Sequence, residues 1–89
     1  MEFEWDPRKA RDNERKHGVH FQEAVEVFGD DHSSTVADPD HSLGEARYLT
    51  FGRTKSGRCL VVGFTERGDR LRLISARPMT RQERQAYES

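Results

Sequence analysis

The sequence has a single cysteine among its 89 residues, and this scarcity excludes two kinds of site. One thiol cannot form a disulfide within the chain, and it cannot build a metal centre of several cysteine thiolates. Cys59 opens an apolar run that ends at Val62, so we expect a small buried side chain and not a nucleophile. Low cysteine content also favours a reducing compartment, and we predict a cytoplasmic protein.

Long hydrophobic runs are absent too, since no apolar stretch reaches the roughly 20 residues that a membrane-spanning helix needs. We therefore expect a soluble protein with no membrane partner. Leu, Ile, Val and Phe supply only 17 of the 89 residues. A chain of this length with so few large apolar residues predicts one domain, residues 1–89, with a thin core that gains stability from a partner.

Net charge is also small, because 15 basic and 16 acidic residues leave −1. This balance hides a division between the two halves. Residues 1–46 carry five basic and twelve acidic residues, a net charge of −7, whereas residues 47–89 carry ten basic and four acidic residues, a net charge of +6. Such asymmetry indicates either a face that binds a polyanion or two halves that attract each other on folding.

Alternating apolar residues predict strands, and helical spacing with cap residues predicts helices. The expected strands are 1–5, 34–37, 47–53, 58–65 and 70–76. The expected helices are 7–17, 21–28 and 81–87. The order β-α-α-β-β-β-β-α predicts an α+β domain of two layers, in which helices pack on a curved antiparallel sheet.

Cap and turn residues set the limits of these elements. Asp6-Pro7 has the form of an N-cap followed by the first helical residue, and Thr80 with Glu83 has the spacing of a capping box. His20 and Glu23 have the same spacing with an unusual cap residue. Turns are expected at 38–40, 54–57 and 66–69.

Several short motifs, taken in order along the chain, resemble those of the BrnT toxin family. They are Phe3-Glu4-Trp5-Asp6, Asn13, Lys16-His17-Gly18-Val19 with Phe21, Arg47-Tyr48, Ile74-Ser75-Ala76-Arg77, Glu83-Arg84 and Tyr87-Glu88. The resemblance spans nearly the whole chain in order and spacing. One departure is His20, where Ser or Asp is expected in the family, and it concerns only the helix cap.

The resemblance implies a RelE-like ribonuclease fold and the toxin role in a bacterial type II toxin–antitoxin pair. It implies that the toxin inhibits translation by cleaving RNA. It also implies a cognate antitoxin of the BrnA type, whose DNA-binding portion lets the complex repress its own operon. The expected partners are therefore this antitoxin and RNA, with operator DNA contacted only through the antitoxin and with no cofactor.

RNA cleavage without a metal ion needs a proton acceptor for the 2′-OH, cations for the phosphorane charge and an acid for the leaving 5′-oxygen. The sequence has no paired aspartates suited to two-metal hydrolysis. Its four histidines, which follow no recognisable ligand spacing, are His17, His20, His32 and His41. Acid–base cleavage assisted by arginine therefore fits the residues better than metal-dependent cleavage.

Five residues are candidates for catalysis. Arg77, at a strand end where a bulge can turn it, is the first choice for the transition-state charge, and Arg72 is the second. His17 ends the first helix, where the helix dipole favours the protonated form, and is a candidate acid. Glu83 is a candidate proton acceptor, and Tyr87 is a candidate for base stacking or for donation to phosphate.

Each candidate also has a purely structural interpretation. Arg77 would then form an ion pair with a carboxylate of the first or second helix, and Arg72 would be solvated. His17 would bond to carbonyls at the helix end, Glu83 would cap the last helix, and Tyr87 would pack against the sheet.

Four further basic residues are candidate RNA contacts. They are Lys16, Arg70, Arg81 and Arg84. Arg70 and Arg72 share a strand face, which we expect to form part of the antitoxin contact. Two other functions stay open: a non-catalytic module that docks on RNA or the ribosome, and a direct DNA-binding regulator. The second is disfavoured because no helix-turn-helix pattern precedes either basic helical segment.

Overall fold

The computed structural model describes residues 1–38 and 44–89, so His41 and most of the expected turn at 38–40 lie outside the described residues. The strands are β1 (Glu2–Glu4), β2 (Ser34–Ala37), β3 (Arg47–Arg53), β4 (Cys59–Arg67) and β5 (Arg70–Pro78). The helices are α1 (Pro7–His17), α2 (Phe21–Ala24), the 3-10 helix η1 (Val25–Gly29) and α3 (Arg81–Glu88). The predicted element order and the α+β class are confirmed.

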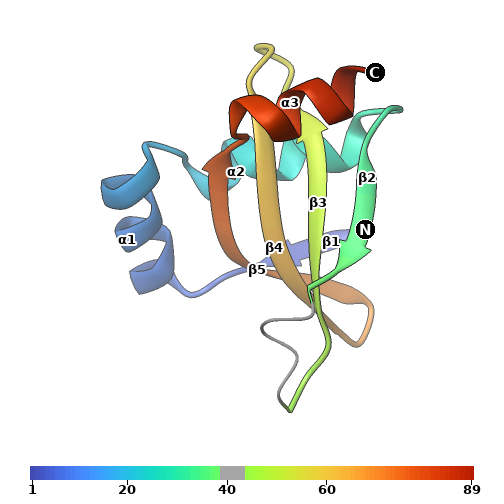
Figure 1. The fold of residues 1–89 in the computed structure, drawn as a ribbon. Coiled ribbons are helices and arrows are strands. Elements are labelled where there is room, and N and C mark those ends of the chain that lie inside the picture. Colours follow the sequence, from blue (N-terminus) through green and yellow to red (C-terminus); the bar gives the residue numbers. More distant parts are fainter. Residues whose placement is uncertain (39–43) are drawn as a thin grey trace.

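All five strands form one curved sheet in the order β1-β5-β4-β3-β2 (Figure 1). Strands β2, β3, β4 and β5 pair antiparallel with one another, as predicted. Strand β1 differs, because it runs parallel to β5 with Phe3 opposite Leu71. Alternation of side chains predicts that a segment is a strand and which face it buries, but it does not determine the partner or the direction.

The second predicted helix is split into a short α-helix and a 3-10 helix. Winding at three residues per turn keeps Ala24 and Val27 on the same side, and both are fully buried. Val27 lies against the backbone of Gly52, where an added Cβ would come within 2.9 Å of the Val27 Cβ. The expected cap at His20 is wrong, since its side chain makes no cap hydrogen bond and its Nδ1 instead lies 3.4 Å from Glu14 Oε2.

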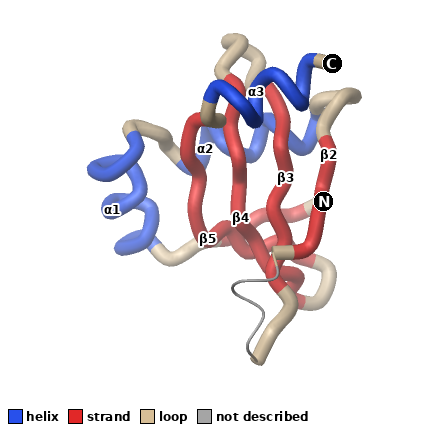
Figure 2. The backbone as a smooth tube through the Cα atoms, in the orientation of Figure 1, coloured by secondary structure: helices blue, strands red, loops and turns tan. Residues whose placement is uncertain are grey.

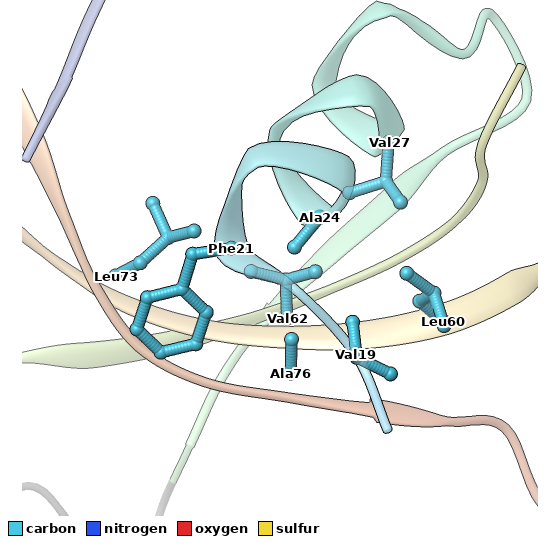
Figure 3. Close-up of a cluster of buried hydrophobic side chains, with 8 residues drawn as sticks. All are labelled: Val19, Phe21, Ala24, Val27, Leu60, Val62, Leu73 and Ala76. Atoms are coloured by element: carbon cyan, nitrogen blue, oxygen red, sulfur yellow. The ribbon is translucent and has the colours of Figure 1, made fainter. Parts of the chain in front are cut away.

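The core lies between the sheet and the segment formed by α2 and η1, as Figure 3 shows. Its fully or almost fully buried members are Val19, Phe21, Ala24, Val27, Leu60, Val62, Leu73 and Ala76. A chain of aromatic contacts extends it, with ring centroids 5.2 Å apart for Phe3 and Phe28 and for Phe28 and Phe64. The core is small, in agreement with the low content of large apolar residues.

Helix α3 lies across the opposite face of the sheet, in front of the strands where α2 is behind them (Figure 2). The predicted capping box at its start is present: Thr80 Oγ1 accepts from the amide of Glu83, and Glu83 accepts from the amide of Thr80. Helices therefore flank both faces at this end of the sheet, which a strictly two-layer arrangement does not describe. No helix among the described residues is long and apolar enough to cross a membrane.

Candidate active site

A bulge in β5 sets the direction of Arg77. The register between β4 and β5 skips Ile74, so the alternation of side chains changes phase at this residue. Leu73 points into the core before the bulge and Ala76 does so after it. Arg77 therefore emerges on the face opposite the core, which it shares with Arg72, as the sequence suggested for a bulged strand end.

The guanidinium of Arg77 is held by Glu83 of α3. Its Nη1 and Nη2 atoms donate to Glu83 Oε1 and Oε2 at 2.8 and 2.9 Å, and Nη1 also donates to the carbonyl of Pro78 at 3.2 Å. Glu83 Oε1 accepts in addition from the amide of Thr80 at 2.8 Å. Arg77 thus forms an ion pair, as its structural interpretation predicted. The acidic partner lies in α3, however, and not in the first or second helix.

This pairing favours the charged form of both side chains. The hydrogen bond from Arg77 lowers the pKa of Glu83 to about 2, although partial burial acts in the other direction. The same bond raises the pKa of Arg77. Glu83 is therefore a weak proton acceptor near neutral pH, and its geometry suits a residue that caps α3 and orients Arg77.

A second group of polar side chains joins α3 to the segment after η1. The Tyr87 hydroxyl donates a short hydrogen bond to Asp30 Oδ2. Asp30 also accepts from the amides of His32, at 3.0 Å, and Arg53, at 2.8 Å. The guanidinium carbon of Arg53 lies 5.7 Å from the centroid of the Tyr87 ring, and its Nη2 donates to Glu88 Oε2 at 2.9 Å. Tyr87 is thus fixed at both its hydroxyl and its ring.

The protonation states of this pair follow from their surroundings. Partial burial raises the pKa of Asp30, but the hydrogen bonds from Tyr87 and from two backbone amides outweigh it, so that the pKa is lowered overall. Burial, together with the hydrogen bond to Asp30, raises the pKa of Tyr87 to about 12. At neutral pH Asp30 is ionised and Tyr87 carries its proton.

Two clefts lie beside Tyr87. The first, which we name the α3 cleft, has a volume of about 340 Å³ and is lined by His32, Ser34, Phe51, Glu83, Ala86 and Tyr87. The second has a volume of about 450 Å³ and is lined by His32, Arg53, Tyr87, Glu88 and Ser89. The α3 cleft adjoins the Arg77 pair, because Glu83 belongs to both.

Arg70 and Arg72 lie toward the other end of β5. Arg77 lies five positions after Arg72, which corresponds to roughly 15 Å along a strand. Arg70 Nε donates to Glu2 Oε2 at 3.2 Å, and Arg72 Nη1 lies 3.9 Å from Glu4 Oε2. These two arginines are thus paired with acids of β1, and the structure does not bring them together with Arg77.

The remaining predicted residues lie at the edges of this region or away from it. Lys16 and His17 end α1, are exposed, and make no side-chain hydrogen bond or ion pair within the described part of the chain. Arg81 and Arg84 are exposed on α3, where Arg84 Nε lies 3.6 Å from Glu88 Oε2. Across residues 1–38 and 44–89, no group of three or more His, Cys, Asp or Glu side chains is arranged to hold a metal ion.

Asp30, Arg53 and Phe51 belong to this region but are not among the site residues predicted from the sequence. Asp30 lies just after the predicted helix 21–28, and Phe51 is an apolar residue of the predicted strand 47–53. Each acquires its place from contacts with α3, more than thirty residues away in the chain. No local spacing signals such contacts, although an acid directly after an amphipathic helix is a usual hydrogen-bond acceptor for nearby amides.

Comparison with known proteins identified a matching family model and a similar solved structure. A family model described as the ribonuclease toxin BrnT of type II toxin–antitoxin systems matches residues 5–83. The chain is also similar in structure to a crystal structure, at 1.1 Å, of the ribonuclease toxin BrnT of Brucella abortus. That match has a TM-score of 0.67 and 24% sequence identity, and it covers 91% of this chain and 99% of the other. No curated protein matched. The likeness supports the fold, and the implied relation to RelE stays a prediction.

Proposed function

Since the chain belongs to the BrnT family of ribonuclease toxins of type II toxin–antitoxin systems, we propose that it cleaves RNA without a metal ion and so inhibits translation in the cytoplasm. The reaction is attack of the 2′-oxygen on the neighbouring phosphorus. A bond from the 2′-oxygen to phosphorus forms as the bond to the 5′-oxygen breaks, and in net terms the 2′-OH proton moves to the leaving 5′-oxygen. The products are a 2′,3′-cyclic phosphate and a 5′-hydroxyl.

The observation that carries this proposal is the fixed guanidinium of Arg77. It donates two hydrogen bonds to the carboxylate of Glu83 and one to the carbonyl of Pro78, while 38% of its side chain stays exposed. A cation that is positioned before the substrate arrives stabilises developing negative charge without the cost of reorganisation. Arg77 is therefore our candidate for the phosphorane charge, and Glu83 is its positioning residue.

The other predicted residues take secondary roles in the proposal. The Tyr87 hydroxyl is already engaged by Asp30, which leaves the ring for contact with RNA. His17 is the candidate proton donor, and Arg72 is a second cation for the phosphate chain. Exposed Lys16, Arg81 and Arg84, together with Arg70, are candidate phosphate contacts.

We propose further that a cognate BrnA-type antitoxin neutralises this toxin by covering the exposed side of Arg77, and that operator DNA contacts the antitoxin only. Support comes from charge: Arg81 is exposed at the start of α3, a few residues from Arg77. An acidic segment laid over this end of the sheet would compete with RNA phosphate for the same cations.

The test uses the purified chain with end-labelled RNA in EDTA. Arg77→Ala should lower the cleavage rate by at least about a hundredfold, in the range measured for loss of one transition-state donor. The matched control is Arg67→Ala, which removes an exposed arginine at the opposite end of the sheet and should leave the rate within about twofold. His17→Ala tests the proton donor, and circular dichroism verifies the fold of every variant.

The product ends separate this proposal from its alternative. Cyclic phosphate ends that form in EDTA and depend on Arg77 support a metal-independent ribonuclease. Intact RNA that is nevertheless retained by the protein supports the non-catalytic binding module instead. Cleavage at the wild-type rate by folded Arg77→Ala and His17→Ala variants would show that the site is elsewhere.

A further inference from the structure

The α3 cleft has the features of a site for a flat, uncharged ligand. Its volume of about 340 Å³ lies within the range of small-molecule sites. Phe51 and Tyr87 contribute two aromatic side chains, and Ala86 contributes a methyl group. The side chains of His32 and Ser34 line the cleft and make no hydrogen bond within the described residues, so their polar atoms are open to a ligand.

The walls of the cleft are fixed before any ligand enters. Tyr87 is held by Asp30 at its hydroxyl and by Arg53 over its ring, and Glu83 is held by Arg77. Phe51 projects from β3 in the interior of the sheet, where it is paired with Ser34 on one side and Val61 on the other. Preformed walls lower the entropic cost of binding.

A cross-strand row connects the cleft to Arg77. Phe51 pairs with Val61, and Val61 pairs with Arg77, so the three side chains leave the same face of the sheet side by side. Two strand spacings separate Phe51 from Arg77, a distance of about 10 Å between their backbones. Both side chains extend toward α3, where Glu83 contacts Arg77 and lines the cleft.

These observations fit one nucleotide bound in a defined direction. Its phosphate would meet the guanidinium of Arg77, and its base would lie in the α3 cleft against Phe51. An aromatic side chain stacks on any base, whereas His32 and Ser34 present polar atoms that distinguish base edges. Phosphate itself is poorly suited to the cleft, since the carboxylate of Glu83 forms part of its lining.

We propose that the α3 cleft binds the base of the nucleotide whose phosphate contacts Arg77, and that this cleft sets the base preference of RNA cleavage. The proposal rests on the proposed ribonuclease function, because it assigns the recognition of substrate at that same site. In this proposal Phe51 stacks on the base, and His32 and Ser34 discriminate among the four bases.

The first experiment measures binding without cleavage. The four nucleoside monophosphates are titrated separately into the labelled protein, and amide chemical shifts are followed by NMR. We expect shifts at His32, Ser34 and Phe51, and a dissociation constant about 5- to 100-fold larger in Phe51→Leu, the range for loss of one base–aromatic stack. The matched control is Tyr48→Leu, an aromatic of the same strand that stacks on Phe64 on the other face of the sheet. It should leave the dissociation constant unchanged.

The second experiment sequences the ends of cleaved RNA. His32→Ala and Ser34→Ala should change the frequencies of the four bases beside the cut by at least about threefold, whereas His20→Ala, outside the cleft, should not.

Unaltered base frequencies in both cleft variants, with RNA still cut, would overturn the cleft proposal and leave the ribonuclease proposal intact. Nucleotide shifts in the cleft without any RNA cleavage would support the base site and overturn the proposed activity. Shifts confined to other surfaces would also overturn the cleft proposal.

Discussion

Asn13 shows how much a single buried polar side chain contributes in a protein with a small core. Its Nδ2 donates to the carbonyls of Val19 and Ala76 at 3.0 and 2.8 Å, and its Oδ1 accepts from the amide of Ala76 at 2.9 Å. These bonds join α1 to the loop after it and to β5. Both the nitrogen and the oxygen of the Asn13 side-chain amide therefore have hydrogen-bond partners. Asn13 is the one buried residue of α1.

Replacing Asn13 by Ala should therefore lower the free energy of unfolding by about 2 to 4 kcal/mol, because it leaves buried backbone groups without partners. Chemical denaturation monitored by circular dichroism gives this value. Asp12→Ala, at an exposed neighbouring position, is the control and should change stability by less than about 0.5 kcal/mol. Equal stability of the two variants would contradict the assigned role of Asn13.

The ion pair of Arg77 and Glu83 predicts a pH dependence. The pKa of Glu83 falls from an ordinary value of 4.5 to about 2 in the folded state. A lowered folded pKa gives stability that is present above about pH 4.5 and is lost as pH falls toward 2. With 26% of the Glu83 side chain exposed, solvent screening reduces the expected contribution to about 1 to 2 kcal/mol.

Glu83→Gln keeps a residue suited to the capping box but removes the titrating group. The difference in unfolding free energy between wild type and this variant should be largest near pH 6 and should shrink toward zero near pH 2. Urea denaturation at several pH values measures it. A difference that stays constant between pH 6 and pH 2 would show that the carboxylate is not held by Arg77.

At the scale of elements, α3 differs from the other helices in how it is attached. None of its residues is buried. Its attachments are polar: Glu83 to Arg77, Tyr87 to Asp30 and Glu88 to Arg53. A helix attached in this way has little buried apolar surface to resist local opening. In the closed state these bonds hold the side chains of α3 in place, but the helix is expected to undergo transient local opening more readily than the strands below it.

Removing one attachment should increase that opening. Tyr87→Phe removes the hydrogen bond to Asp30, and Asp30→Ala removes it together with the two bonds that Asp30 accepts from backbone amides, so each should accelerate amide hydrogen exchange in α3 by about tenfold or more, with little change in β4. The double variant should exchange in α3 no faster than Asp30→Ala alone. Asp31→Ala, an exposed neighbour, is the control. Unchanged exchange in both single variants would mean that apolar contacts, and not this bond, hold α3.

At the scale of the whole molecule, the two oppositely charged halves partly neutralise each other. Arginines of the basic half that lie in ion pairs are Arg53, Arg58, Arg70, Arg72, Arg77 and Arg84. The acids Glu2, Glu4 and Glu23 supply the partners from the acidic half. Attraction between the halves therefore accounts for part of the charge asymmetry, and it leaves a smaller basic surface than the composition suggests.

Because Arg70, Arg72 and Arg84 would have to leave their ion pairs to bind phosphate, we expect only a few of the candidate contacts to be engaged at once, and RNA binding to depend weakly on salt. If the protein neutralises about two to three phosphates, the plot of log affinity against log salt concentration should have a slope of about −1.5 to −2 for single-stranded RNA. Fluorescence anisotropy with a short labelled RNA at several salt concentrations measures it. A slope steeper than about −4 would show that the paired arginines also bind phosphate.

The sequence predicted much of the architecture because local patterns carry that information. Alternation and cap residues defined the limits of β2 and β3, and the Thr80 and Glu83 spacing predicted the capping box. Prediction failed at the cap of α2 and at the direction of β1, which depend on neighbours distant in the chain. In the candidate site, Arg77, Glu83 and Tyr87 were identified from the sequence, but Asp30 and Phe51 were not.

The sequence by itself determined the α+β class, the order of elements and the resemblance to one family, since these depend on residues close together in the chain. Only the tertiary structure decided which charges meet. It paired Arg77 with Glu83 and Arg72 with Glu4, and it placed Phe51 under α3 beside Tyr87. The physical reason is that one bulge at Ile74 and the order of the strands, neither of which follows from local spacing, decide which side chains share a face.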